Sequence, residues 1–306
     1  MSMEYEKQNQ QQDYGVQQSQ PLSYGAQNGS LGSILSSNSS VFVKQQIGAV
    51  EAVTGGLYEQ KNKYTVYGQN GIGTEEIFTA EEESSFCSRC FCAPQHSLFI
   101  RISVNGNVEY TLERKGLCCE KICLLCPACT ESCADEMSLY QGAVDGKPGN
   151  VMNATPLYTV RQVTACGAMF HPTLHVFRHG SSDPSVEIKG PCIFGGCSEL
   201  CCSSSFKATK RGQDAGMIKK MRPNDCCTML SECATDADRF QLDFDSGADG
   251  DERIAMLAAL FLTDFMFFEQ DLGTCKPRPN GTFGCTCFEC YCCGILCPCT
   301  FTSNSS

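Results

Sequence analysis

Two neighbouring stretches near the end of the chain decide the fold: Thr235-Asp-Ala-Asp-Arg-Phe-Gln-Leu242 and Ile254-Ala-Met-Leu-Ala-Ala-Leu-Phe-Leu-Thr-Asp-Phe-Met-Phe-Phe-Glu269. The first stretch is acidic, and the second is almost purely apolar. Carboxylate oxygens suit a hard cation such as calcium, whereas an apolar segment of this kind has to be buried in protein or in lipid. The two stretches together predict a protein that couples calcium to a membrane.

The apolar stretch is predicted to form a helix from Glu252 to about Glu269. It contains neither Gly nor Pro, and acidic residues lie near its start, where the helix dipole favours them. The apolar part, 254–268, would be about 22 Å long, shorter than the roughly 30 Å of a bilayer's hydrocarbon core. Asp264 would add about 2.5–3.5 kcal/mol in mid-membrane. Both arguments favour a buried core helix over the alternative, a membrane-spanning helix.

Much of the chain from about Val41 has the pattern of β-structure. Short alternating or β-branched runs are separated by turn residues, and Asn105-Gly106 between two runs is a strong two-residue hairpin signal. The predicted strands are 63–67, 98–104, 108–112, 157–161, 174–177 and 186–189. Regularly spaced short strands are typical of an antiparallel barrel or sandwich. We therefore predict an all-β domain with one C-terminal apolar helix.

The two ends of the chain differ in composition from this domain. Residues 1–40 are rich in Gln, Asn, Ser, Gly and Tyr and cannot bury enough apolar area to offset the entropy of ordering, which predicts a disordered tail. Residues 271–306 contain Pro, Gly and eight cysteines. We therefore divide the chain into a tail over 1–40, a domain over 41–270 and a cysteine-rich tail over 271–306.

Charge and cysteine content limit the classes of partner and compartment. The formal net charge of −11 disfavours nucleic acid as the main partner. The chain has 25 cysteines, and residues 1–40 lack the basic and apolar regions of a signal peptide. A cytosolic start is expected, where thiols stay reduced and serve as metal ligands, lipid-attachment sites or buried apolar groups. No nucleophile elbow, phosphate loop or acid–base pair stands out, so the sequence does not indicate an enzyme.

Several short motifs occur in the order found in one known family. The most specific are Thr235-Asp-Ala-Asp238 and Asp264-Phe-Met-Phe-Phe-Glu269. The shorter ones are Val53-Thr-Gly55, Asn62-Lys-Tyr64, Thr111-Leu-Glu-Arg114, Cys126-Pro127, His171-Pro172 and Gly190-Pro-Cys192. On these residues the chain resembles the phospholipid scramblases over about 44–270. The resemblance implies a closed antiparallel β-barrel, similar to the tubby-like fold, around a central hydrophobic helix.

The resemblance also implies an activity. Members of the family move phospholipids between leaflets in both directions, respond to calcium, need no ATP and attach to membranes through palmitoylated cysteines. We therefore expect phospholipids and a membrane as partners, at the cytoplasmic face of the plasma membrane or as a single-pass protein, with a nuclear pool as an option. The sequence leaves the oligomeric state open. Two rivals also stay open: a zinc-stabilised, membrane-tethered adaptor and a lipid-binding regulator, neither of which transports lipid.

The calcium candidates follow from aligning the acidic stretch on an EF-hand loop. The residues at loop positions 1, 3, 5, 7 and 9 are Asp236, Asp238, Phe240, Leu242 and Phe244. Only the two aspartates supply side-chain oxygens, and the glycine and bidentate carboxylate of a complete loop are missing. We therefore expect weak calcium binding, in the high-micromolar to millimolar range. The alternative is an acidic turn followed by apolar residues that alternate into the core.

A dense cysteine cluster spans 118–133, where the family has its acylated run. One acyl chain binds membranes only marginally, so stable attachment needs at least two. The palmitoylation candidates are Cys118, Cys119, Cys126 and Cys129. Zinc is the rival ligand, because Cys-x2-Cys spacing suits tetrahedral thiolate ligation. The second cluster, 285–299, lies outside the family pattern and presents the same choice of acylation, or of disulfides if the apolar helix spans a membrane.

Two further groups have simple structural interpretations. The basic stretch from Lys207 to Arg222 is expected to be a solvated face, with contact to anionic headgroups or a nuclear import signal as alternatives. His171, His175 and His179 share a spacing that puts them on one face of a helix or strand. The apolar residues between them favour a strand over a metal triad.

Overall fold

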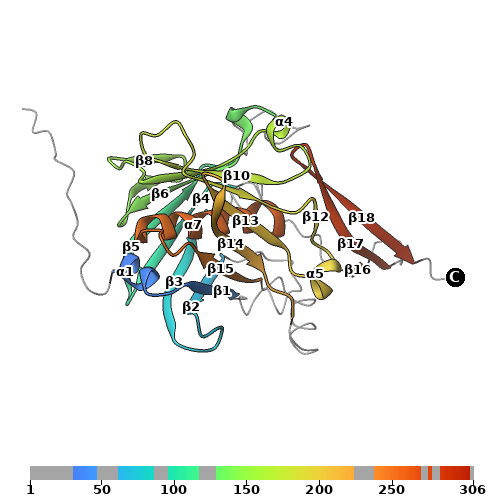
Figure 1. The fold of residues 1–306 in the computed structure, drawn as a ribbon, viewed down its shortest axis with the longest axis horizontal. Helices are drawn as coiled ribbons and strands as arrows, with labels where there is room; N and C mark the ends of the chain where they lie inside the picture. Colours follow the sequence, from blue (N-terminus) through green and yellow to red (C-terminus); the bar gives the residue numbers. More distant parts are fainter. Residues whose placement is uncertain are drawn as a thin grey trace, which may run out of the picture.

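A closed barrel of antiparallel strands surrounds the helix α7 (Figure 1). The structure is a computed structural model, which describes residues 30–46, 61–85, 96–116, 129–223, 238–269, 275–277 and 283–303. Strand order around the barrel is β1-β15-β14-β13-β11-β10-β9-β6-β5-β4-β3-β2, and β1 pairs with both β15 and β2 to close it. The predicted fold, a closed antiparallel barrel around a C-terminal helix, is confirmed.

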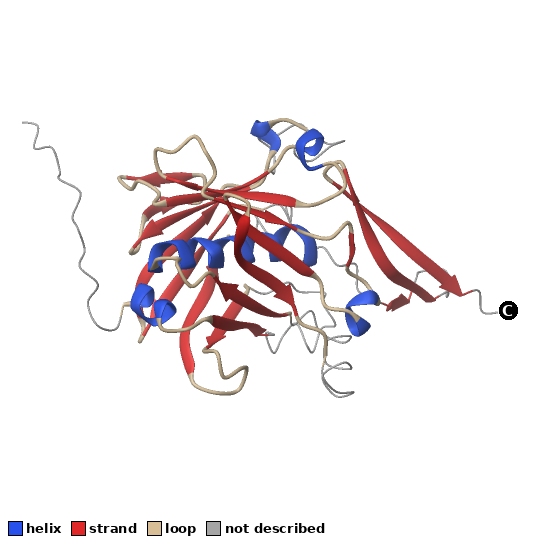
Figure 2. Ribbon diagram, in the orientation of Figure 1, coloured by secondary structure: helices blue, strands red, loops and turns tan. Residues whose placement is uncertain are grey.

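The barrel strands are β1 (Ser40–Gln46), β2 (Lys63–Tyr67), β3 (Glu76–Glu83), β4 (Leu98–Val104), β5 (Asn107–Arg114), β6 (Glu136–Gln141), β9 (Tyr158–Gln162), β10 (Thr173–Arg178), β11 (Val186–Lys189), β13 (Ser205–Lys210), β14 (Gln213–Lys220) and β15 (Arg239–Phe244). The remaining elements are α1 (Leu31–Ser36), η1 (Glu131–Cys133), β7 (Asp145–Lys147), β8 (Asn150–Met152), α4 (Ala165–Ala168), β12 (Ile193–Phe194), α5 (Ser198–Cys201), α7 (Gly250–Thr263), η2 (Asp264–Phe268), β16 (Cys275–Pro277), β17 (Phe283–Cys292) and β18 (Ile295–Ser303). Figure 2 shows the helix crossing the inside of the strand layer.

The strands follow the period-two pattern expected when one face of a sheet packs on a core. All six predicted strands are present, with ends shifted by no more than a few residues. Asn105 and Gly106 join β4 to β5 with positive φ angles of 50° and 80°, as a tight two-residue hairpin requires. The sequence did not predict β13 and β14, which contain the basic stretch. Their buried residues are few, so the alternation there is weak.

The central helix is buried all round because strands surround it on every side. Every residue from Glu252 to Phe268 is buried. At its start the Asp249 carboxylate accepts a hydrogen bond of 2.8 Å from the backbone N–H of Glu252. The last turn, η2, is a π-helix, a form that often occurs at functional sites. The expectation of a core helix is confirmed. In the described ranges, every helix is too short or too polar to span a bilayer.

Residues 30–40 correct the predicted N-terminal boundary, because they are ordered rather than part of a disordered tail. The helix α1 places Leu31 and Leu35 in the core, one turn apart on the same face. It packs closely on the start of α7, where a Cβ on Gly250 would lie 2.8 Å from the Cα of Gly32. The polar composition of 1–40 concealed this short apolar face. The rest of the predicted tail, 1–29, lies outside the described residues.

One arginine joins this N-terminal segment to the barrel. The guanidinium of Arg253, in the first turns of α7, donates to the carbonyl oxygens of Leu35 at 2.7 Å and Asn38 at 2.6 Å. It also donates to the carbonyls of Ala248 and Asp245, both at 3.2 Å. Four carbonyls from two segments thus depend on one planar, multidentate donor.

Arg253→Lys is expected to lower the free energy of unfolding by about 1.5 kcal/mol, since an ammonium cannot reach carbonyls on both sides at once. Urea denaturation of the purified protein measures this. Arg178→Lys, on the exposed end of β10, is the matched control and should change stability little. Equal stabilities of the Arg253 and Arg178 variants would contradict the role given to the guanidinium.

The barrel has two ends with different chemistry. We call the end where η2 finishes the exit end and the end where α7 begins the start end. Because neighbouring strands are antiparallel, the β1–β2, β3–β4, β5–β6, β9–β10, β11–β13 and β14–β15 connections all belong to the exit end. All 25 cysteines of the sequence occur in these connections or after the helix. The described cysteines are therefore concentrated at the exit end and in the segment after the helix.

The segment predicted as a cysteine-rich tail contains a small sheet. Strand β17 pairs with β18 along its length, with β16 near one end and with β12 near the other. Tyr291 of β17 is buried and its ring packs edge-on against Phe267 of η2, with centroids 6.1 Å apart. The backbone N–H of Tyr291 also donates to the carbonyl of Cys192 at 2.9 Å. This sheet is therefore attached to the exit end of the barrel.

Candidate functional site

Buried charged groups gather around the last turn of the central helix, at the exit end. The Nζ of Lys220, at the end of β14, lies 2.9 Å from a carboxylate oxygen of Asp238 and 3.6 Å from one of Glu199. It also lies 4.1 Å from the ring centroid of Phe268. Asp264, the first residue of η2, accepts a 2.8 Å hydrogen bond from the Tyr64 hydroxyl. We call Tyr64, Glu199, Lys220, Asp238 and Asp264 the acid–lysine cluster.

The electrostatics of the acid–lysine cluster follow from its burial. Burial raises the pKa of Asp264 well above its ordinary value, and the negative charge of Asp238 adds to this effect. Burial acts to lower the pKa of Lys220, but Asp238 and Glu199 outweigh it and raise that pKa. The pKa of Tyr64 is raised by burial and by Asp264. The cluster therefore favours a charged Lys220 and a protonated Asp264.

A second buried network lies beside it on β2, β3 and the end of the helix. The Glu82 carboxylate contacts His96 Nε2 at 3.0 Å and accepts from the Asn62 backbone N–H at 3.0 Å. The Asn62 side chain donates to Glu269 Oε1 at 2.5 Å. Glu269 Oε2 and His96 Nδ1 are buried without a hydrogen-bond partner in the described structure. Burial, followed by the charge of Asp264, raises the pKa of Glu269 well above its ordinary value.

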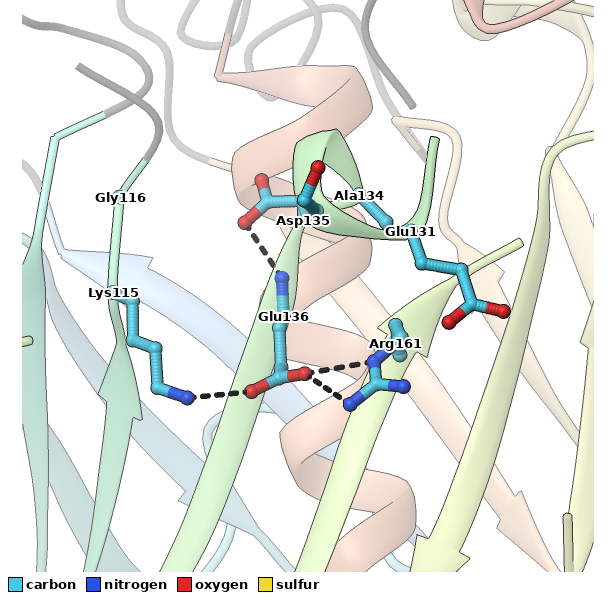
Figure 3. Close-up of a pocket in the computed structure, with 8 residues that line it drawn as sticks. Lys115, Gly116, Glu131, Ala134, Asp135, Glu136 and Arg161 are labelled. Atoms are coloured by element: carbon cyan, nitrogen blue, oxygen red, sulfur yellow. Dashed lines mark hydrogen bonds and ion pairs between the residues drawn. The ribbon is translucent and has the colours of Figure 1, made fainter. Parts of the chain in front are cut away.

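An open pocket of about 380 Å³ lies at the same end, between β5, β6 and β9 (Figure 3). Its wall holds both signs of charge, with Glu136 between Lys115 at 2.9 Å and Arg161 at 2.7 Å. Burial acts to raise the pKa of Glu136, but hydrogen bonds and charge from Lys115 and Arg161 outweigh it and lower that pKa. A pocket lined with cations and anions is suited to a zwitterionic group.

The pocket is connected to the core through a buried ion pair. Asp135 lines the pocket and pairs with the fully buried Arg114 of β5 at 2.5 Å. The Arg114 guanidinium in turn lies 5.4 Å from the ring centroid of Phe265 in η2. A change at the pocket wall therefore has a short path of contacts to the last turn of the helix.

The five calcium candidates have different places in the structure. Asp236 lies outside the described residues, and Asp238 is paired with Lys220. Phe240, Leu242 and Phe244 point into the core from β15, which is paired with β1 on one side and β14 on the other. Residues 239–244 are therefore a barrel strand, and an EF-hand-like loop does not form there. Calcium binding by the aspartates stays a prediction.

Only one of the four palmitoylation candidates lies within the described residues. Cys118, Cys119 and Cys126 lie outside the described residues. Cys129 is half-buried at the exit end, and its sulfur is in a disulfide. Acylation there would require the reduced thiol, so the assignment stays a prediction. For the zinc alternative, the described part of the chain contains no group of three His, Cys, Asp or Glu side chains placed to hold a metal ion.

The basic stretch and the histidines have structural partners. Lys210 pairs with Glu252 at 2.8 Å and Lys220 belongs to the acid–lysine cluster, so the basic stretch is not one solvated face. His175 lies on β10, as the strand prediction requires, and contacts Glu187 at 3.1 Å. His171 contacts the carbonyl of Gly190 at 3.0 Å. The Lys220–Asp238 pair could not be predicted from the sequence, because Lys220 ends β14, Asp238 directly precedes β15 and a long connection separates them.

Comparison with known proteins identifies the family. The family model for scramblases matches residues 19–270, which include the whole barrel, the acid–lysine cluster and the pocket. The chain belongs to the scramblase family. No solved structure matches it. The match ends with the central helix, so the β16–β18 sheet of this chain lies outside the family region.

Three curated relatives illustrate the similarity. Human phospholipid scramblase 1 is 31% identical over 238 residues, which cover 77% of this chain and 64% of the human protein. Bovine phospholipid scramblase 2 is 30% identical over 236 residues, covering 76% and 69% of the two chains. Human phospholipid scramblase family member 5 is 26% identical over 232 residues, covering 76% and 74%. The chain thus spans less than two thirds of the length of the human phospholipid scramblase 1 that it matches.

Proposed function

We propose that this scramblase-family protein moves phospholipids between the leaflets of a bilayer, in both directions, in response to calcium and without ATP hydrolysis. The observation that carries the proposal is the family match over 19–270, which includes every strand of the barrel and the complete central helix. The relatives are named as phospholipid scramblases. The protein would act as a lipid transporter at a membrane rather than as an enzyme.

The exit end is the part of the barrel best suited to headgroups. The barrel interior is filled by α7, whose residues from Glu252 onward are all buried, so the inside offers lipids no passage. The pocket at the exit end presents Lys115 and Arg161 beside Glu136, which matches the opposite charges of a zwitterionic headgroup. We place headgroup contact at this pocket, and the acyl anchors at Cys118, Cys119 and Cys126 in the connection that leads into it.

Calcium would act on the acid–lysine cluster. Asp236 and Asp238 are the proposed ligands, and the described one, Asp238, is already neutralised by Lys220. A calcium ion would have to compete with this ammonium, which supports weak binding. Displacing Lys220 would also remove its contacts with Glu199 and with the Phe268 ring, so binding would alter the packing of the last helical turn.

Reconstitution of the purified, acylated protein into liposomes with a dithionite-quenchable lipid tests this function. We expect calcium at millimolar concentration to expose inner-leaflet lipid to dithionite, and Asp236→Ala with Asp238→Ala to lower the stimulated rate about tenfold. Asp145→Ala, an exposed aspartate of β7 at the start end, is the matched control and should behave like wild type.

Two outcomes would contradict the proposal in different ways. Flat dithionite kinetics with properly bound protein would reject transport and support the alternative of a membrane-tethered regulator or adaptor. Unchanged calcium heats in calorimetry of the double aspartate variant would reject the two ligands while leaving transport intact.

A further inference from the structure

Large apolar side chains are exposed mainly at one end of this protein. The exposed large hydrophobic side chains of the described residues are Met152, Met169, Phe170, Ile193, Ile295 and Phe301. Only Met152 belongs to the start end. The others lie in the turn after α4, in β12 and in β18, which all belong to the exit end or to the sheet attached to it. Such a bias is typical of an interaction surface rather than of scattered exposed residues.

The β12–β17–β18 sheet concentrates this property on one face. Register aligns Ile193 with Cys290, and Cys290 with Cys297, so these three side chains share a face. Leaving aside Cys285, which lies opposite Phe301 and whose sulfur is in a disulfide, the alternation of each strand extends that face to this set: Ile193, Phe288, Cys290, Cys292, Ile295, Cys297, Cys299 and Phe301. Every member is apolar or a thiol. We call this set the thiol–apolar face.

The opposite face of the sheet is the one that packs on the barrel. Thr286, Glu289 and Tyr291 alternate with the thiol–apolar residues, and all three are buried. Phe194, the neighbour of Ile193, is buried against Phe267 with ring centroids 5.7 Å apart. The barrel side of the sheet is thus already covered, whereas Ile193 is 51% exposed and Phe301 is 67% exposed.

Charge is nearly absent from this element. Between Phe283 and Ser303 the one ionisable carboxylate is Glu289, which is buried on the barrel side. Hydrogen bonding with Cys293 raises the pKa of the Cys292 thiol, which favours its neutral form. An uncharged face with aromatic and branched side chains suits the boundary between headgroups and acyl chains, and it does not suit recognition of a charged partner.

The tip of the hairpin joins this face to a second apolar turn. The backbone N–H of Cys293 donates to the carbonyl of Met169 at 2.6 Å, which places the tip beside the turn after α4 (Figure 1). Met169 and Phe170 are 54% and 55% exposed. Figure 2 shows the hairpin extending from this contact beyond the barrel. The apolar surface is therefore continuous from the α4 turn onto the hairpin.

We propose that the thiol–apolar face of the β12–β17–β18 sheet, together with the turn at Met169 and Phe170, is a lipid-contacting surface that lies in the interface of a bilayer. This deepens the proposed function, because it assigns the surface by which the protein sits on the membrane, and it uses residues beyond the family region. Attachment through this surface depends on buried apolar area. We therefore expect membrane binding even without acylation, and we expect that binding to be insensitive to salt.

The test uses the full-length protein purified without acylation from a bacterial host, and uncharged phosphatidylcholine vesicles. The sequence contains no Trp, so Phe301→Trp introduces a unique fluorophore into the face. We expect a blue shift and at least about twofold quenching by brominated phosphatidylcholine. Met152→Trp, exposed at the start end, is the matched control and should be quenched little. In flotation, Ile295→Ser with Phe301→Ser is expected to weaken vesicle binding about tenfold, with Met152→Ser unchanged.

Both substituted positions are exposed, so the variants should fold like wild type, which circular dichroism checks. Equal quenching at positions 301 and 152 would overturn the proposal. A blue shift of Phe301→Trp without lipid, accompanied by a doubled mass in solution, would also overturn it and indicate that a second copy covers the face. Loss of dithionite-detected transport with intact quenching would reject the proposed function alone, so the two failures are distinguishable.

Discussion

Replacing Lys220 by methionine is expected to lower the free energy of unfolding by about 3–5 kcal/mol. Methionine fills the space of the alkyl stem but removes the charge that Asp238 and Glu199 face at 2.9 and 3.6 Å. Only 11% of the lysine side chain is exposed, so water cannot replace the ammonium fully. The remaining carboxylate charges would be left buried next to Asp264. Urea denaturation at pH 7 measures the loss.

A second variant distinguishes lost charge from lost packing. Lys220→Met combined with Asp238→Asn is expected to recover more than half of the stability, because Glu199 keeps hydrogen bonds from the Gly195 N–H at 3.0 Å and the Ser204 hydroxyl at 2.5 Å. Lys219→Met is the matched control on the opposite face of the same strand and should cost little. No recovery in the double variant would show that the unpaired charge is not the cause.

Periodicity and length were sufficient for the central helix and for six of the twelve barrel strands, whereas closure of the barrel around the helix was implied by the family resemblance. Residues 254–268 are too few for a bilayer and apolar all round, which only a surrounding sheet can satisfy. The two-residue turn at Asn105-Gly106 fixed one hairpin directly. The helix α1 could not be predicted from local pattern. Its stability comes from Arg253 and from contact with α7, which lie more than 200 residues later in the chain.

The β17–β18 hairpin was not predicted, because many of its residues are cysteines. Cysteine can be a metal ligand, an acylation site or a small apolar residue, so its presence does not by itself indicate a strand. Counted as small apolar residues, the cysteines alternate with a period of two along β18, as in Ile295, Cys297, Cys299 and Phe301. The same alternation that predicted the barrel strands would have predicted this strand.

The candidate site was predicted in part. Asp238, the described aspartate of the acidic stretch, lies at the exit end of the barrel, where its carboxylate accepts a hydrogen bond from Lys220. The sequence could not show that Lys220 compensates Asp238, since this depends on the pairing of β14 with β15. From the sequence, Asp264 was an obstacle to a membrane span and the first residue of a family motif, with no predicted role in a site. In the structure it is a buried acid at the centre of the site, hydrogen-bonded to Tyr64 at 2.8 Å.

Asp264 makes the stability of this protein depend on pH in an unusual direction. Burial raises its pKa well above the ordinary value, and Asp238 adds to the rise, while Tyr64 and Lys220 act against it. A carboxyl whose pKa is higher in the folded state takes up a proton on folding. Its contribution to stability is therefore complete below the unfolded pKa of about 3.9 and is lost as the pH rises towards the folded pKa.

Asp264→Asn is accordingly expected to increase the free energy of unfolding at pH 7, on the order of 3 kcal/mol, because the amide needs no proton to be buried. Asn retains an oxygen to accept from Tyr64, and its amide N–H can donate to Asp238. The gain should shrink towards zero as the pH falls to about 4, where the unfolded aspartate is itself half protonated. Urea titrations of both proteins from pH 4 to pH 8 measure this difference, with the exposed Asp183→Asn as the control. Burial raises the pKa of Glu269 in both proteins, but Asp264 adds to that rise only in the wild type, so its removal adds to the expected gain. A loss of stability in Asp264→Asn that is constant with pH would mean that the folded protein holds Asp264 as a charged, paired carboxylate.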